Sequence, residues 1–305
     1  MTWDGLARLW LHEPDSRALE CAGALGLATS GSSLDELAAG FSELFLLNVY
    51  PYGSVFTDPS AELNGRFASW SASRYDRRGY VTAEFWDAGA PDHVGLCLGY
   101  LGHLEKLGET DADFTRALQQ WLPVCALAVE RDPSAVALYR ELAATTRALL
   151  LREEAGGPGL SAAGDAATDE SPDGAASGEE VHLSDVLAHL LAPARSGFFL
   201  SRARLGQIGL QSGMRLPFGG RYEVARALFA AAGESGRVAE VLGALSVEAD
   251  AWDAAYAHWE SEHPAWVRLA PPWRARIVRT RGRLAGMGDL LRRPLDLEYG
   301  ANVPR

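Results

Sequence analysis

Apolar residues recur at three- and four-residue steps through most of this 305-residue chain, and this periodicity constrains the fold more than any other feature. Leu37, Phe41 and Leu44 form such a stripe within residues 34–45, and residues 94–104 carry a second one. This spacing places apolar side chains on one face of a helix. No stretch alternates with period two for long enough to indicate a sheet. The sequence therefore predicts an all-α helical bundle.

Helix start signals support this prediction. Ser33 and Glu36 have the spacing of a capping box, and a proline directly after Asp132 is typical of a first helical turn. Ser184 and Ser201 are expected to cap helices in the second half of the chain. Further helices are expected from about residue 111, over residues 221–232 and 251–260, and after residues 271–273.

One segment differs from the rest in composition. Residues 155–180 consist mainly of Gly, Ala, Ser, Asp and Glu, with no basic or aromatic residue. Such a stretch has too little apolar surface to offset the entropy of ordering it. We expect a flexible acidic linker here. It would divide a helical domain, residues 1–154, from a C-terminal helical region, residues 181–305.

Charge and composition exclude several classes of protein. The net charge is −12, which disfavours nucleic acid as a partner and favours a basic peptide. No run of about 18 apolar residues is present, so no membrane insertion is expected. The N-terminus lacks the basic region of a secretory signal, and a cytoplasmic location is expected. The three cysteines form no C-x-x-C pair, which is typical of reduced thiols.

The motifs of common catalytic sites are absent from the sequence. There is no P-loop, no G-x-S-x-G elbow and no H-E-x-x-H helix, and no cofactor is expected. His93 and Cys97 are four residues apart and could share a metal ion, but no further ligands accompany them. Glu260 and His263 supply only one of the two E-x-x-H motifs that a di-iron bundle needs. Structural roles are favoured for all four residues.

The remaining candidate is a peptide-binding constellation before residues 94–104. Asp92 is expected to cap that helix while presenting a negative charge, and His93 beside it can donate or accept a hydrogen bond. Upstream, Trp70, Tyr75 and Trp86 could form the floor of a groove. The alternative is that these rings fill the core and that the Asp-His pair is only a cap.

Three motifs in this order resemble the TorD/DmsD/NarJ family of redox-enzyme maturation chaperones. The first is the acidic amphipathic helix that begins Leu34-Asp35-Glu36-Leu37. The second is the loop Pro51-Tyr52-Gly53-Ser54-Val55-Phe56, and the third is the helix start Pro91-Asp92-His93. The resemblance covers residues 5–151, about half of the chain.

The resemblance implies a helical bundle that binds the apo form of a molybdopterin-dependent oxidoreductase, or its twin-arginine signal peptide, and assists cofactor insertion. Cys97 and Gly99 stand where similar proteins often carry glutamates, so two contacts for an arginine pair are missing here. Residue by residue, the resemblance implies a peptide-binding role for Pro51, Ser54, Trp70, Tyr75, Trp86, Pro91, Asp92 and His93.

Two other functions remain open. An enzyme could act in a cleft between the two helical parts, with His93 approaching Glu260 or His263. A permanent assembly subunit of a redox complex would instead stay bound to its mature partner. Binding of an apo client by a chaperone is the leading hypothesis.

Overall fold

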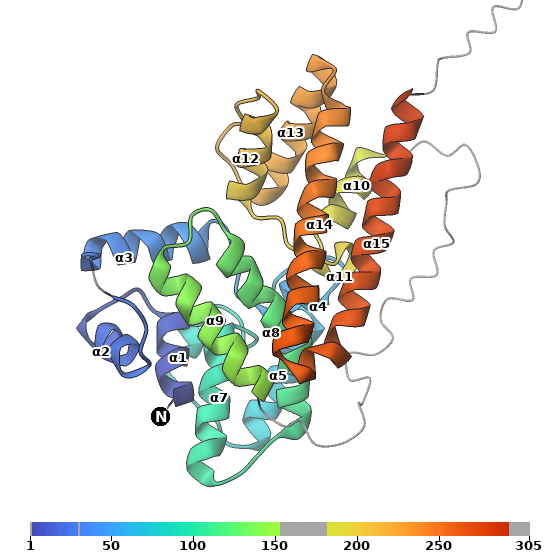
Figure 1. The fold of residues 1–305 in the computed structure, drawn as a ribbon. Coiled ribbons are helices and arrows are strands. Elements are labelled where there is room, and N and C mark those ends of the chain that lie inside the picture. Colours follow the sequence, from blue (N-terminus) through green and yellow to red (C-terminus); the bar gives the residue numbers. More distant parts are fainter. Residues whose placement is uncertain (1, 30, 153–181, 293–305) are drawn as a thin grey trace, which may run out of the picture.

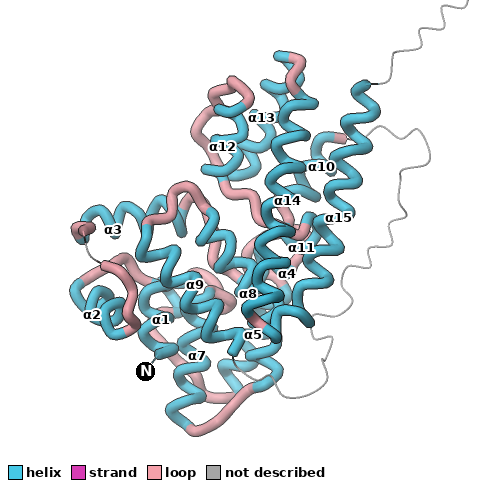
Figure 2. Tube along the Cα trace, in the orientation of Figure 1, coloured by secondary structure: helices cyan, strands magenta, loops and turns pink. Residues whose placement is uncertain are grey.

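The computed structural model describes residues 2–29, 31–152 and 182–292. Every regular element in these ranges is a helix, and the only β-type pairing there is an isolated antiparallel bridge between Tyr52 and His93. Figure 2 shows helices joined by loops throughout the described part of the chain. The all-α prediction is confirmed. None of the described helices is long and apolar enough to cross a membrane.

The first half of the chain packs around two helix pairs. Helix α1 lies against α7, and α8 lies against α9 (Figure 1). Shorter helices connect these pairs and cover their ends. The bounds are α1 Thr2–Leu11, α2 Ser16–Ala24, α3 Leu34–Phe41, the π-helix η1 Ser42–Leu46, α4 Gly53–Thr57, α5 Arg66–Arg77, α6 Phe85–Ala88, α7 Val94–Leu107, α8 Ala112–Arg131 and α9 Ala137–Arg152.

Glycines allow α1 and α7 to approach closely. A Cβ atom on Gly95 would lie 2.3 Å from Leu11 Cγ and 2.8 Å from the carbonyl oxygen of Ala7. One on Gly102 would lie 2.7 Å from Asp4 Oδ1. Because the missing Cβ atoms leave room for the neighbouring backbone, these glycines set the distance between the two helices. Helix α7 is therefore buried along most of its length.

The second half of the chain packs onto the first. Phe199 stacks on Phe56 with ring centroids 5.4 Å apart, and the indole nitrogen of Trp273 donates to the carbonyl oxygen of Gln120 at 2.9 Å. One continuous apolar core includes buried residues from both halves. The bounds are α10 Leu183–Leu190, α11 Pro193–Ser196, α12 Arg202–Gln211, α13 Arg221–Ser235, α14 Val238–Glu262 and α15 Pro264–Arg292.

A buried carboxylate also connects the two halves. Glu248 of α14 is 2% exposed and forms ion pairs with Arg131, at the end of α8, and with Arg204 of α12. The indole nitrogen of Trp252 donates to the same carboxylate at 2.8 Å. Three donors thus surround this charge, as a buried carboxylate requires. The predicted linker lies outside the described residues, so the domain division stays a prediction.

Several helix boundaries differ from expectation. The Ser33–Glu36 capping box and the Ser201 cap are present. Asp132 ends α8 instead of starting α9, because its carboxylate accepts from the Ser134 backbone in a tight turn. In the second half, α10 begins at Leu183, so Ser184 is not its cap. Helix α14 is much longer than the expected residues 251–260. Helix α15 begins before its two internal prolines, Pro271 and Pro272, rather than after them.

Candidate functional site

The two sequence motifs at residues 51–56 and 91–93 meet in the structure. The Gly53 amide donates to the Asp92 carbonyl at 3.0 Å, and the Val94 amide donates to the Pro51 carbonyl at 2.8 Å. The Tyr75 hydroxyl donates to the Pro91 carbonyl at 2.9 Å. These hydrogen bonds give partners to backbone amide and carbonyl groups of the two loops that lie outside the helices. We call this arrangement the motif junction, and it fixes where α7 begins.

Asp92 is the buried centre of the motif junction. Its Oδ2 accepts from the Ser54 amide at 2.6 Å and from the Ser54 hydroxyl at 2.5 Å. The hydroxyl oxygen of Ser54 in turn accepts from the Gly65 amide at 3.0 Å. Asp92 is 0% exposed, and its Oδ1 has no hydrogen-bond partner. Burial raises the pKa of Asp92, and the two bonds from Ser54 oppose that effect.

His93, rather than Asp92, caps α7. Its Nδ1 accepts from the Gly95 amide at 3.1 Å, so the neutral ring carries its proton on Nε2. The ring meets Tyr52 edge-on, with centroids 4.9 Å apart. Burial, together with the nearby His12, lowers the pKa of His93 to about 3. The side chain is therefore uncharged at neutral pH.

The expectation that Asp92 presents a charge at the surface is wrong. The backbone pairing of the motif junction turns both Asp92 and His93 inward, and Ser54, Tyr75 and Pro51 are buried with them. Pro91 is partly buried. These residues come together as the resemblance implies, but they leave no exposed carboxylate at the start of α7.

The three aromatic residues expected to line a groove do not form one wall. Trp70 stacks on Phe114, with centroids 5.5 Å apart and rings 7° from parallel. Tyr75 is 1% exposed and lies inside the core. Trp86, in contrast, is 92% exposed on the short helix α6. Only Trp86 could meet a partner with its whole ring.

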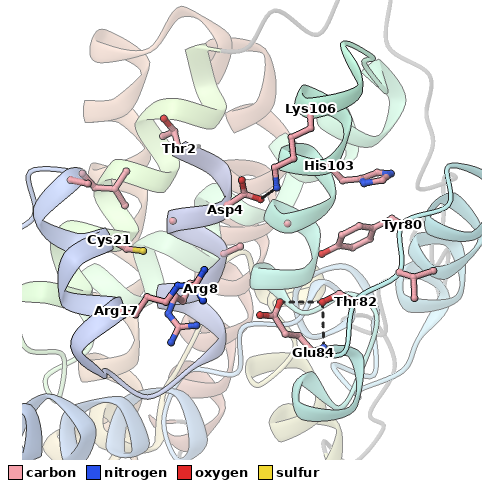
Figure 3. Close-up of a pocket in the computed structure, with 16 residues that line it drawn as sticks. Thr2, Asp4, Arg8, Arg17, Cys21, Tyr80, Thr82, Glu84, His103 and Lys106 are labelled. Carbon is pink, nitrogen blue, oxygen red and sulfur yellow. Dashed lines mark hydrogen bonds and ion pairs between the residues drawn. The ribbon is translucent and has the colours of Figure 1, made fainter.

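A groove lies on the other side of α7, between α1, α2 and the loop that precedes α6 (Figure 3). It has a volume of about 690 Å³. Gly99 lies in its wall, where a Cβ atom would come 2.3 Å from the Tyr80 hydroxyl. Polar groups from four segments line it: Thr2, Asp4 and Arg8 of α1, Arg17 and Cys21 of α2, Tyr80, Thr82 and Glu84 of the loop, and His103 and Lys106 of α7.

Both signs of charge are present in the groove. Asp4 pairs with Lys106 at 2.8 Å, and Glu84 contacts the Nε2 atom of His12 at 3.1 Å. The side chains of Asp4 and Glu84 are each 38% exposed. These two carboxylates remain open to water and can therefore accept bonds from a basic ligand at little desolvation cost.

Most of these groove residues could not be identified from the sequence. They come from α1, α2 and the loop at residues 80–84, none of which contains a recognisable motif. One signal was available: Gly95, Gly99 and Gly102 recur at helical spacing within residues 94–104. Such a row of small residues lets another helix approach closely, although it does not identify that helix.

The residues considered for a metal site or an enzyme active site do not come together in the structure. The Cys97 sulfur lies 3.5 Å from the Tyr75 hydroxyl oxygen, and burial raises the pKa of the thiol. No group of three potential metal ligands occurs within the described ranges. His263 contacts Arg147, and Glu260 pairs with Arg274 of α15. The groove is lined by none of His93, Glu260 and His263.

A family model matches part of the chain. The model of the family described as "Nitrate reductase delta subunit" matches residues 14–127, which include the groove loop, the motif junction and most of α8. Searches of curated proteins and of solved structures found no significant match. The matched region agrees with the resemblance to TorD-like proteins. Residues 14–127, a little over a third of the chain, are thus similar to the nitrate reductase delta subunit family, whose NarJ- and TorD-type members are maturation chaperones of molybdoenzymes.

Proposed function

We propose that this chain is a cytoplasmic chaperone that binds the apo catalytic subunit of a molybdopterin-dependent oxidoreductase, including its twin-arginine signal peptide where one is present. The family match over residues 14–127 carries this proposal. The client leaves once it has matured. The chain transforms no substrate and holds no cofactor of its own.

We place the docking site in the groove between α1, α2 and α7. Its partly exposed carboxylates, Asp4 beside Lys106 and Glu84 beside His12, suit a basic stretch of polypeptide. Trp86 follows Glu84 by two residues and is 92% exposed, and Val81 in the same loop is 86% exposed. Large exposed rings beside polar groups are typical of the centres of peptide-binding surfaces. An apolar, arginine-containing segment therefore fits this region.

The motif junction has a positioning role in this proposal. Residues 51–54 and 91–93 fix the start of α7, and Gly99, His103 and Lys106 of α7 line the groove. Asp92 and His93 thus act through the helix they position and make no direct contact with the client. This replaces the direct peptide-binding role that the resemblance implies for them.

The experiment that tests the function compares two forms of one client. The catalytic subunit of a molybdoenzyme from the same organism is purified without cofactor and, separately, in its mature form. Calorimetry should detect binding of the chain to the apo form only. Equal binding to both forms would favour a permanent assembly subunit, and no binding to the apo form would contradict the proposal.

A further inference from the structure

Helix α15 carries arginines on two opposite faces. Arg274 and Arg281 face α14 and pair there with Asp253 and Asp250. Arg276, Arg279 and Arg283 lie about half a turn away at spacings of three and four, and so share another face. Within the described ranges, none of these three forms an ion pair with a carboxylate.

A fourth arginine joins this second face. Helix α11 packs on α15 and carries the exposed Arg195. His189, on α10, contacts α15: its Nδ1 accepts from Arg283 at 3.1 Å, and its Nε2 meets the Thr280 hydroxyl at 2.7 Å. Burial and the charges of Arg283, Arg195 and Arg279 lower the pKa of His189 to about 4. We call Arg195, Arg276, Arg279 and Arg283 the arginine patch.

The arginine patch is unusual in a chain of net charge −12. Arg279 and Arg283 are exposed, and the half-buried Arg276 stacks on Trp273 at 4.8 Å. Burial and the charge of Arg279 lower the pKa of Arg276. Four guanidinium groups that repel one another while 40 acidic residues lie elsewhere in the chain favour an anionic partner at this surface.

The chain itself contains a matching sequence. Residues 153–181 hold eight carboxylates and no basic residue. This segment joins the end of α9 to the start of α10, and His189 lies in the last turn of α10. Because α10 has eight residues, it spans only about 12 Å. A tethered acidic segment that begins so near the patch has an effective concentration in the millimolar range.

We propose that the arginine patch on α11 and α15 is a docking site for the chain's own acidic segment, residues 153–181. The contact is electrostatic, between guanidinium groups and carboxylates. It lies in the C-terminal part of the chain, outside the region of the family match. An acidic segment of another protein could reach the patch only by displacing the tethered one.

The test uses the full chain in two forms, one intact and one with residues 153–181 replaced by a Gly-Ser sequence of equal length. The probe is a synthetic peptide of residues 153–181, and calorimetry measures its affinity at low and moderate salt. The replaced chain should bind the peptide, more weakly as salt rises, because screening weakens exposed charge contacts. The intact chain should bind it at least tenfold more weakly, because its own segment occupies the patch.

Charge reversal locates the site. In the replaced chain, Arg195→Glu with Arg279→Glu should weaken peptide binding at least tenfold, whereas Arg140→Glu, an exposed arginine on α9, should not. If the double variant does not fold, Arg279→Gln alone should still weaken binding severalfold. Equal peptide affinity in the intact and replaced chains would overturn the proposal. Tighter binding of inorganic pyrophosphate than of the peptide would also overturn it and indicate a phosphate site.

Discussion

Ser54 and Asp92 show how single residues support this fold. The Ser54 hydroxyl donates to the fully buried Asp92 carboxylate and accepts from the Gly65 amide. One small side chain therefore provides a hydrogen-bond partner to two other segments of the chain. The pairing of Ser54 with Asp92 could not be predicted from sequence, because 38 positions separate them and no local pattern joins them. The motifs at residues 51–56 and 91–93 identified both residues as site candidates. Their burial follows only from the pairing of the two loops.

Removing the Ser54 hydroxyl should destabilise the protein. Ser54→Ala leaves Asp92 with one donor fewer and the Gly65 amide without its acceptor, and each buried unsatisfied group costs about 1–3 kcal/mol. We expect the free energy of unfolding to fall by about 2 kcal/mol in urea titrations. Ser69→Ala, at an exposed position on α5, should change it little. Equal effects of the two substitutions would contradict the role given to Ser54.

His93 should make stability depend on pH. The pKa of His93 is about 3 in the folded chain and 6.5 in the unfolded chain, so unfolding takes up a proton between these values and stability falls as pH falls through this window. His93→Asn keeps a capping side chain but removes this proton. Around pH 5, the slope of unfolding free energy against pH should decrease by about 1.4 kcal/mol per pH unit. An unchanged slope in urea titrations at pH 4.5–6 would show that His93 is not buried as a neutral ring.

At the scale of the elements, glycines determine how closely α1 and α7 pack. Periodicity predicted the existence of most helices, because a stripe of apolar residues needs only local sequence. It could not predict that α1 packs on α7, since Gly95 and Gly102 indicate a close neighbour without identifying it. Boundaries were less predictable: the Asp132 carboxylate serves a turn instead of a cap, and tertiary burial extends α14 well beyond its local signals.

The helix contact predicts opposite effects of two glycine substitutions. Gly95→Ala would place a methyl group against Leu11 and the Ala7 backbone, and overpacking of this kind costs about 1–3 kcal/mol. Gly206→Ala, inside α12 with no atom within 4 Å of the added carbon, should stabilise by up to about 1 kcal/mol. Thermal unfolding should therefore shift down for Gly95→Ala and up for Gly206→Ala. An unfolding temperature of Gly95→Ala that does not fall would mean that α1 does not approach α7 closely.

At the scale of the molecule, the described parts of the two halves pack onto one another. Their apolar core is continuous, and Glu248 joins α8, α12 and α14 through charge-assisted bonds. The all-α class could be predicted from sequence, but this packing could not, because its contacts join residues more than 100 positions apart, such as Arg131 and Glu248. The groove between α1, α2 and α7 could not be predicted for the same reason, because Asp4 and Lys106 in it are about 100 positions apart.

Glu248→Gln should lower the stability of both halves together. The change removes the charge that Arg131 and Arg204 share, and hydrogen bonds to charged groups contribute about 1.5–3 kcal/mol. Hydrogen exchange should accelerate in both α8 and α12, and circular dichroism and tryptophan fluorescence should report one coincident transition at a lower temperature. Faster exchange in α12 alone would show that the halves unfold separately.

We propose above that a client peptide binds in the groove between α1, α2 and α7, and a binding measurement tests this most directly. The probe is a synthetic twin-arginine signal peptide from the molybdoenzyme of the same organism, and calorimetry measures its affinity for the full chain. Trp86→Ala and Glu84→Gln should each weaken binding at least tenfold, whereas Phe218→Ala, which removes an 82% exposed ring before α13, should leave it unchanged. Undiminished binding by both the Trp86 and the Glu84 variant would contradict the proposed docking site.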